Sequence, residues 1–279
     1  MTTMRIAVIQ PLGNKRYEEQ RNVEEAGRRL DEAAATGAQI LCLPEGYPGP
    51  FFKGNRYDSF EAMQAKAAEH QRYVIMGTTE AVPDQPDHHY ITTWLIGPNG
   101  DIVGRYDRTT PIGPMVYARW QINYVGADEI PPVFDTPWGK IGVITCGEIF
   151  IPELARLLAL RGANIIFNPA GDPLAKHAPG WRALVVARAV ENNVVVAACQ
   201  QITRNGESGV GIIAGPDGPI EVATGPGVLA HTVDQDALWK YQNPGTFDEA
   251  LRGLATSAGG FPGIRNWRRP ELFGPIAAA

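Results

Sequence analysis

Two reactive side chains stand where apolar, strand-like runs of the sequence end. Glu45 follows the run at 39–43 in the segment LCLPEGYPGPFF, and Cys146 follows the run at 141–145 in the segment GVITCGEIF. Sheets of α/β proteins place their ligands at the carboxyl ends of strands. Partial burial there would raise the pKa of the Glu45 carboxyl and suit it to general-base work. The structural alternative is a carboxylate that only caps a loop.

Cys146 differs from the other two cysteines in its surroundings. A helix is expected a few residues after it, and a nearby helix N-terminus would lower the pKa of the thiol and favour the thiolate. Gly147 would let a backbone amide approach a substrate oxyanion closely. The alternative is a buried structural cysteine. We expect that role for Cys42 and Cys199, because each lies inside an apolar strand run.

Other chemistry has weaker support in the sequence. His177, in the segment GDPLAKHAPGW, could partner Cys146 as a base, or it could simply flank a pocket. Arg105 and Arg108, in GRYDRTTPIGP, form only a charged loop when taken alone. The sequence has no GxxxxGK[ST], Cys-x-x-Cys or His-Glu-x-x-His pattern, so we predict neither a metal site nor a phosphate-binding loop.

The elements that must position these residues alternate between strands and helices. Apolar periodicity and turn residues predict one α/β domain whose sheets are large, mixed and packed together. Each half ends in a hairpin on a Pro-Asn-Gly or Pro-Asp-Gly turn, which suggests two related halves. The predicted strands are 5–10, 39–43, 73–78, 90–96, 101–106, 141–145, 164–167, 194–198, 210–214, 220–223 and 228–233, and the predicted helices are 22–35, 60–70, 152–161 and 182–191.

Composition narrows the class of protein. The chain has 279 residues, of which 44% are hydrophobic and 20% charged, and this composition is typical of a globular protein. A net charge of −5 with no basic stripe makes nucleic acid an unexpected partner. Membrane binding is not expected, because no apolar run is long enough to span a bilayer. Three widely separated cysteines and the absence of a secretory pattern favour a reducing, cytoplasmic setting.

Taken together and in order, these segments resemble the nitrilase (carbon–nitrogen hydrolase) superfamily from residue 5 to about residue 234. RIAVIQ resembles its first strand, LCLPEGY its catalytic glutamate segment, and GRYDR its Gly-x-Tyr-x-Lys segment. PWGKIGVITCGEIFIPELAR resembles the segment of the cysteine nucleophile, WRALVVARAVENNVVVAACQ the following helix and strand, and GVGIIAGPDG the late hairpin. The ordered set is more specific than any one piece.

The resemblance implies a single-domain, four-layer α-β-β-α sandwich, here at residues 1–240, and cofactor-free hydrolysis of an amide, nitrile or carbamoyl compound. It assigns Cys146 as the nucleophile that forms the thioester and Glu45 as the general base. The backbone amide of Gly147 would help to hold the oxyanion. Tyr47 and Phe51 follow Glu45 and are candidates for contacting the substrate or supporting the site.

Two positions depart from the family pattern. Arg108 stands where the family has a lysine; arginine keeps a fixed charge and can donate two hydrogen bonds, but it cannot give up a proton near neutral pH. Gln121 is the best match to a second glutamate of the family, and an amide cannot act as a base. Glu148 could replace that glutamate, or it could be a carboxylate favoured by a helix N-terminus.

The leading hypothesis is therefore a cysteine amidase with Arg108 as its altered polarising residue, and its substrate could be anionic because arginine binds carboxylates well. A nitrilase or an N-carbamoyl hydrolase on the same residues is the first alternative. A catalytically silent member that binds a ligand or partner is the second. Family members usually associate, so we expect a homodimer or a larger homo-oligomer. The Gly- and Pro-rich stretch at 241–279 is expected to pack on the core or on a partner subunit.

Overall fold

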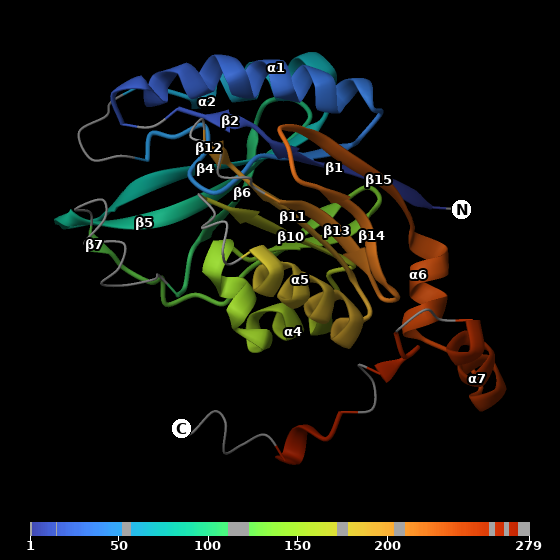
Figure 1. The fold of residues 1–279 in the computed structure, drawn as a ribbon. Helices are drawn as coiled ribbons and strands as arrows, with labels where there is room; N and C mark the ends of the chain where they lie inside the picture. The colour runs from blue at the N-terminus through green and yellow to red at the C-terminus, as the bar shows by residue number, and fades with distance from the viewer. Residues whose placement is uncertain are drawn as a thin grey trace.

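The computed structural model describes residues 2–14, 16–51, 57–110, 123–171, 178–203, 210–256, 260–264 and 268–272. Two mixed sheets lie face to face, with helices on both outer faces (Figure 1). Within the described residues, no helix combines the length and the apolar run that a membrane crossing requires.

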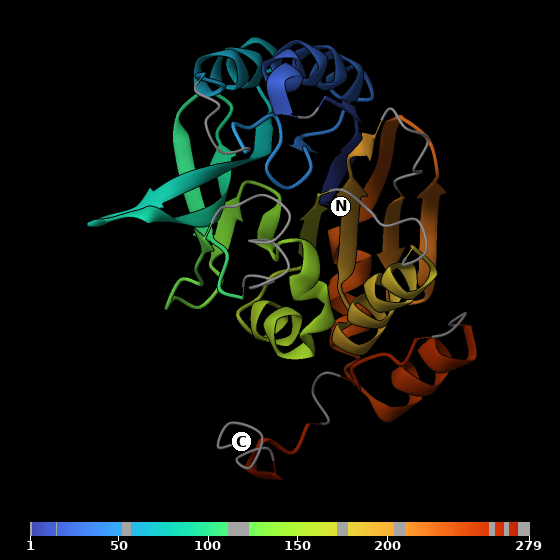
Figure 2. The same cartoon turned by 60° about the vertical axis from the view of Figure 1, so that its left-hand side comes forward.

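The first sheet has a parallel centre with antiparallel neighbours. Strands β1, β3 and β4 run parallel, β15 pairs antiparallel with β1, and the β4–β5–β6 meander completes the order β15-β1-β3-β4-β5-β6, with β7 beside β5. The far end of the β4–β5 hairpin extends beyond the body of the molecule (Figure 2). The bounds are β1 Thr3–Gln10, β3 Ile40–Cys42, β4 Tyr73–Val82, β5 Gln85–Ile96, β6 Ile102–Asp107, β7 Asn123–Tyr124 and β15 Gly227–Asp234.

The second sheet repeats this plan. Strands β9, β10 and β11 are parallel, and β8, β13 and β14 add antiparallel edges in the order β14-β13-β11-β10-β9-β8. The paired hairpin turns predicted two related halves of the chain. Each half does provide the three parallel strands at the centre of one sheet. The bounds are β8 Val133–Thr136, β9 Gly139–Val143, β10 Ile165–Ala170, β11 Val195–Gln200, β13 Gly211–Gly215 and β14 Gly218–Ala223, and the short strands β2 Leu12–Gly13 and β12 Ile202–Thr203 pair separately.

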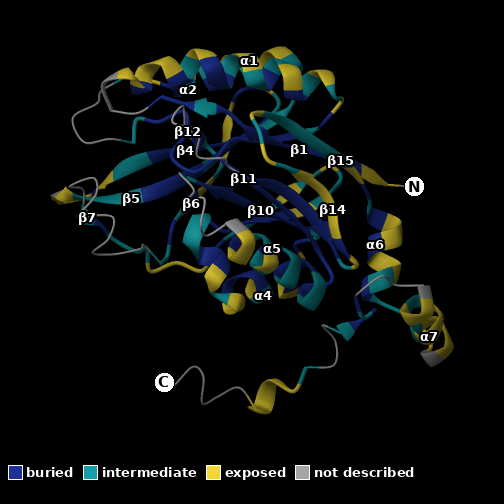
Figure 3. Cartoon of the chain, in the orientation of Figure 1, coloured by how far each residue is buried: buried dark blue, intermediate teal, exposed yellow. Residues whose placement is uncertain are grey.

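Three apolar layers hold the stack together, and Figure 3 shows the buried strands between outer helices whose far sides are exposed. Strands alternate their side chains between two faces. In β10, Ile165 and Phe167 face the first sheet, whereas Ile166 faces helices α4 and α5. Helices α1 and α2 cover the other face of the first sheet, through residues such as Leu30 and Met63. The helices are α1 Asn22–Ala35, α2 Phe60–His70, α4 Pro152–Leu160 and α5 Ala178–Asn192, with 3-10 turns η1 Arg16–Arg21 and η2 Cys146–Phe150.

The end of the chain adds helices that the sequence pattern did not predict in detail. Helix α6, Gln235–Gln242, follows β15, and helix α7, Phe247–Thr256, and the 3-10 turn η5, Pro270–Leu272, lie within the Gly- and Pro-rich stretch. The Gln242 amide donates to the Asn193 carbonyl at 2.8 Å, and the Asn193 amide donates to the Phe261 carbonyl at 3.1 Å. The described segment after α6 thus contacts the same chain. A separate tail at 241–279 stays a prediction.

A close backbone contact fixes the loop that follows β3. The Gly77 amide in β4 donates to the Tyr47 carbonyl at 3.0 Å, and Gly77 also bridges to Pro48. A Cβ at Gly77 would lie 2.3 Å from the Gly46 backbone nitrogen, so only glycine lets the loop lie on β4. Gly46 itself has a φ of +58°, in the left-handed region. Two glycines therefore set the path of the chain just after Glu45.

We predict that Gly77→Ala lowers the free energy of unfolding by about 1–3 kcal/mol, because the added methyl group overpacks a backbone contact. Gly27→Ala is the matched control. A Cβ at Gly27, in α1, would meet only a flexible lysine carbon at 3.7 Å, so the better helix propensity of alanine should raise stability by about 0.5–1 kcal/mol. Urea unfolding of both variants measures the difference. Equal stabilities would show that the loop tolerates the methyl group.

Candidate active site

Four chain segments meet where strands of the two sheets end. Glu45 lies three residues after β3, Arg108 directly follows β6, Cys146 begins η2 after β9, and Gly171 directly follows β10. The face-to-face packing of the sheets brings these carboxyl ends together, although Gly171 is 126 positions from Glu45 in the sequence. The site is therefore shared between the two halves of the chain.

The Glu45 carboxylate is buried and accepts three hydrogen bonds. Its Oε1 accepts a hydrogen bond from Arg108 Nη1 at 3.0 Å, and its Oε2 accepts one from the Gly171 backbone N–H, also at 3.0 Å. The Cys146 thiol donates a further hydrogen bond to the carboxylate. A Cβ at Gly171 would lie 2.9 Å from Oε2, so glycine allows this approach. Glu45 is thus held in one orientation beside the sulfur.

Cys146 has a strained backbone. Its φ of +50° lies in the left-handed region, which costs a residue other than glycine about 1–3 kcal/mol. Asn168 Nδ2, in β10, holds the turn by donating to the Ile144 carbonyl at 2.9 Å and to the Cys146 carbonyl at 3.2 Å. The side chain itself is only partly buried. The conformation presents the sulfur at the start of a turn rather than within the sheet.

The pKa of each reacting group follows from burial and charge. Burial raises the pKa of Glu45 above its usual value, although Arg108, the Cys146 thiol and the Gly171 N–H each oppose the shift. Burial, followed by the negative charge of Glu45, raises the pKa of Cys146 to about 12, against a smaller lowering by Arg108. The expectation that a helix N-terminus lowers the thiol pKa is wrong. The reason is that α4 begins only at Pro152, while Glu45 is in direct contact.

Arg108 supplies the positive charge of the site. Burial alone would lower its pKa, but the charges of Glu45, Cys146 and Glu148 raise it above the usual value, so the guanidinium stays protonated. Its Nε–H has no hydrogen-bond partner among the residues that the structure describes. Arg105, three residues earlier, points elsewhere: it pairs with Asp107 at 3.0 Å and stacks on Trp94.

The other residues singled out by the sequence divide into three groups. Glu148 is fully buried beside the nucleophile turn and accepts hydrogen bonds from Tyr106 and Thr145. Gly147 is partly exposed next to Cys146, and its predicted oxyanion role stays a prediction. Gln121 and His177 lie outside the described residues, so their predicted roles stay predictions.

Tyr47 and Phe51 have different surroundings. Tyr47 packs with Leu30 and Met63 in the core beneath α1 and α2 and has no exposed surface. The predicted substrate contact by its ring is therefore wrong, because this loop side chain turns toward the helices. The Tyr47 backbone carbonyl still holds the loop on β4. The Phe51 ring packs over Gly46 and against Tyr124, with ring centroids 5.7 Å apart. It remains a candidate for lining the site.

Sequence reasoning missed several groups that complete the site. They are Gly171, Asn168, Thr145 and Tyr124, the last of which feels the negative charge of Glu45. Asn168 was detectable in principle, because a polar residue inside the apolar run IIFNPA must find partners for its amide. The amide of Gly171 had no such signal, since a backbone donor looks the same at every residue.

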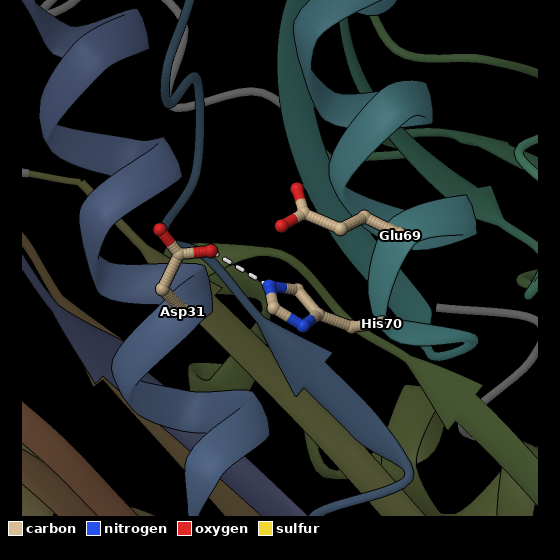
Figure 4. A group of neighbouring side chains, drawn as sticks. All are labelled: Asp31, Glu69 and His70. Carbon is tan, nitrogen blue, oxygen red and sulfur yellow. Dashed lines mark hydrogen bonds and ion pairs between the residues drawn. The ribbon is translucent and has the colours of Figure 1, made fainter.

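A group of possible metal ligands lies elsewhere, between α1 and α2. Figure 4 shows Asp31, Glu69 and His70 facing one another, with His70 Nε2 2.6 Å from Asp31 Oδ1. Lys66 Nζ already contacts Asp31 at 2.8 Å and Glu69 at 2.9 Å. The Lys66 ammonium group thus occupies the position that a metal ion would need. Together with Lys66, these three residues form an ionic link between α1 and α2.

Comparison with known proteins agrees with this architecture. A deaminated glutathione amidase of Synechocystis is 28% identical over 242 residues, covering 78% of this chain and 87% of that protein. An omega-amidase of Bos taurus is 29% identical over 213 residues, covering 71% and 74%. Among solved structures, the NitN amidase of Nesterenkonia sp. AN1 matches with a TM-score of 0.74 at 21% identity, over 98% of this chain and 99% of that one.

The solved structures confirm the predicted α-β-β-α sandwich. One of them is a variant of the Nesterenkonia amidase in complex with butyramide, which matches with a TM-score of 0.72 at 23% identity, over 89% of this chain and 96% of that one. The sequence model described as carbon–nitrogen hydrolase matches residues 5–238. The chain therefore belongs to the carbon–nitrogen hydrolase family, as the ordered motifs indicated.

Proposed function

We propose that this chain is a cysteine-dependent amidase that hydrolyses a small amide through an acyl-thioester on Cys146. The observation that carries the proposal is the set of hydrogen bonds on Glu45. One buried carboxylate receives the Cys146 thiol, the Arg108 guanidinium and the Gly171 amide at once. The names of the two relatives, both amidases, favour an amide over a nitrile or a carbamoyl substrate.

In the first half of the reaction, Glu45 takes the thiol proton as the sulfur attacks the carbonyl carbon. The raised pKa of Cys146 keeps the resting thiol protonated, so the proton moves only as the bond forms. The carbonyl oxygen becomes an oxyanion, which Arg108 and the backbone N–H of Gly147 stabilise. When the intermediate collapses, the C–N bond breaks, the nitrogen takes the proton from Glu45, and ammonia leaves.

In the second half, water gives a proton to Glu45 and attacks the thioester carbon. The C–S bond breaks, the proton returns to the sulfur, and the carboxylic acid leaves. The sum is amide plus water giving acid plus ammonia. Glu45 carries every proton in both halves, and its raised pKa makes it a stronger base than an ordinary carboxylate.

Arg108 limits this mechanism because it cannot act as an acid. Its guanidinium cannot release a proton, so the leaving nitrogen must be protonated by Glu45. It can, however, use separate N–H groups for separate tasks. Nη1 holds Glu45 in place, while the Nε–H, unpartnered within the described part of the chain, is available as a donor. A lysine has a single ammonium for both tasks.

We predict that the purified protein releases ammonia and a carboxylic acid from a small amide, and that Cys146→Ala lowers the rate by about 10⁴-fold or more. The assay covers small amides beginning with butyramide, the matching nitriles, and carbamoyl amino acids. Mass spectrometry of the quenched reaction should detect the acyl group on Cys146. Turnover that persists in Cys146→Ala, or turnover of nitriles alone, would contradict the amidase proposal.

The pH dependence gives a second prediction. Because catalysis needs ionised Glu45 and its pKa is raised, kcat/KM should fall on acidification at a pH above the usual 4.5 of glutamate. Arg108→Gln removes a charge that lowers this pKa, so the acid limb should move to higher pH. Arg108→Lys keeps the charge and should leave the limb near its native position. If the acid limb of the kcat/KM profile stays at the same pH in Arg108→Gln, the group that titrates is not Glu45.

A further inference from the structure

Glu148 lies two residues after Cys146 and joins two distant segments of the chain. Its Oε1 accepts hydrogen bonds from the backbone N–H groups of Thr109 and Thr110, at 3.0 and 3.2 Å, and from the Thr109 hydroxyl at 2.9 Å. Its Oε2 accepts the backbone N–H of Thr145 at 2.7 Å. The Tyr106 hydroxyl lies 2.7 and 2.8 Å from the two oxygens.

These contacts exclude two roles for Glu148. The residue has no exposed surface, and both of its oxygens are occupied by donors of the protein itself. A group that already accepts four or more hydrogen bonds has no lone pair left for a substrate or water proton. Glu148 is therefore suited neither to act as a second base nor to contact the substrate.

The two segments that Glu148 joins are those that carry the charge and the nucleophile. Thr109 and Thr110 directly follow Arg108, and Thr145 directly precedes Cys146. The Glu148 backbone N–H also donates to the Thr145 carbonyl at 3.0 Å, so Glu148 holds both backbone polar groups of Thr145, the residue before Cys146. Displacement of either segment would change the separation between the guanidinium and the sulfur.

We propose that Glu148 is a positioning residue that fixes Arg108 relative to Cys146, a role that rests on the proposed function of those two residues. A carboxylate is required because every partner presents a donor. A glutamine would turn its NH₂ toward one of them. The oxygen would stay with the larger group of donors near Thr109, and the NH₂ would face the Thr145 N–H and break the link to the nucleophile turn.

A double-mutant cycle on the alkylation of Cys146 tests this without any substrate. Iodoacetamide is the probe, and mass spectrometry of the Cys146 peptide gives its rate; Cys42 and Cys199 are fully buried. In the native background Glu148→Gln should slow alkylation about tenfold, because Arg108 moves away and no longer favours the thiolate. In the Arg108→Gln background the same change should alter the rate less than about twofold, since the positioned charge is gone.

Hydrolysis of the best amide provides a second readout. We expect Glu148→Gln to lower kcat by about 100-fold with KM within about threefold, the pattern of a misplaced catalytic group. Glu148→Asp, which keeps the carboxylate, should recover part of the loss. Asp107→Asn is the matched control. It also converts a carboxylate next to Arg108, but its partners, the Thr92 hydroxyl and Arg105, belong to neither segment that Glu148 joins, and its kcat should stay within about twofold.

The outcomes separate the two proposals. Equal slowing of alkylation by Glu148→Gln in both backgrounds would overturn the positioning role, even with hydrolysis intact. If the effects of the Glu148 and Arg108 substitutions on the alkylation rate are coupled but no amide is hydrolysed, the positioning role is supported and the amidase proposal is rejected. If Glu148→Gln does not fold, Tyr106→Phe replaces it in the same cycle, because it removes one donor and leaves the backbone bonds in place. Additive effects of Tyr106→Phe would again overturn the proposal.

Discussion

A carboxylate removed from water must find hydrogen-bond donors nearby, and two such carboxylates organise this molecule where its sheets meet. Glu45 receives donors from the residue after β10, from the residue after β6 and from the sulfur of Cys146. Glu148 receives them from the segment after β6 and from the turn before Cys146. Leaving such a charge without its partners would cost about 3–5 kcal/mol. The relative placement of four chain segments thus follows from satisfying two buried negative charges.

The surrounding fold makes those partners available. Parallel strands at the centre of both sheets deliver their carboxyl ends to one region, and the apolar layer between the sheets fixes how they face one another. Glycines then permit the closest approaches, at Gly77 beneath the Glu45 loop and at Gly171 beside the carboxylate. The strained φ of Cys146 is maintained because the Glu148 backbone N–H holds the carbonyl of Thr145 before it and Asn168 holds the carbonyl of Cys146 itself.

Sequence reasoning located the elements well where the apolar pattern was strong. The helix at 22–35 was predicted with its observed bounds, because a buried stripe through Leu30 and Ala33 ends at a glycine. The strand at 39–43 was close to β3 at Ile40–Cys42. Strand β8 and helix α6 were missed, since VFDT and QDALWKYQ have no clear apolar period. The long β4–β5 hairpin was shortened for the same reason, as polar residues fill its outer end.

The candidate site was harder to predict than the fold. Glu45, Arg108 and Cys146 come together as the ordered motifs indicated. The pKa of Cys146 was predicted in the wrong direction, because nearby burial and a direct carboxylate contact outweigh a distant helix end. Tyr47 was a candidate for contacting the substrate, but its side chain is buried among residues beneath α1 and α2, since sequence alone does not show which way a loop side chain turns. Backbone donors such as Gly171 carry no sequence signal at all.

In the proposed mechanism, an arginine where the resemblance implies a lysine also changes the number of titratable protons in the site. A lysine would add a second titratable proton to the reacting groups. Loss of that proton at alkaline pH would remove the positive charge of the lysine. Arg108 keeps its proton and its positive charge throughout that range. In the proposed mechanism, the resting pair of Cys146 and Glu45 then shares a single proton, and the nucleophile forms when that proton moves from the sulfur to the carboxylate. The proposed active site then holds one transferable proton beside an arginine whose positive charge does not change with pH.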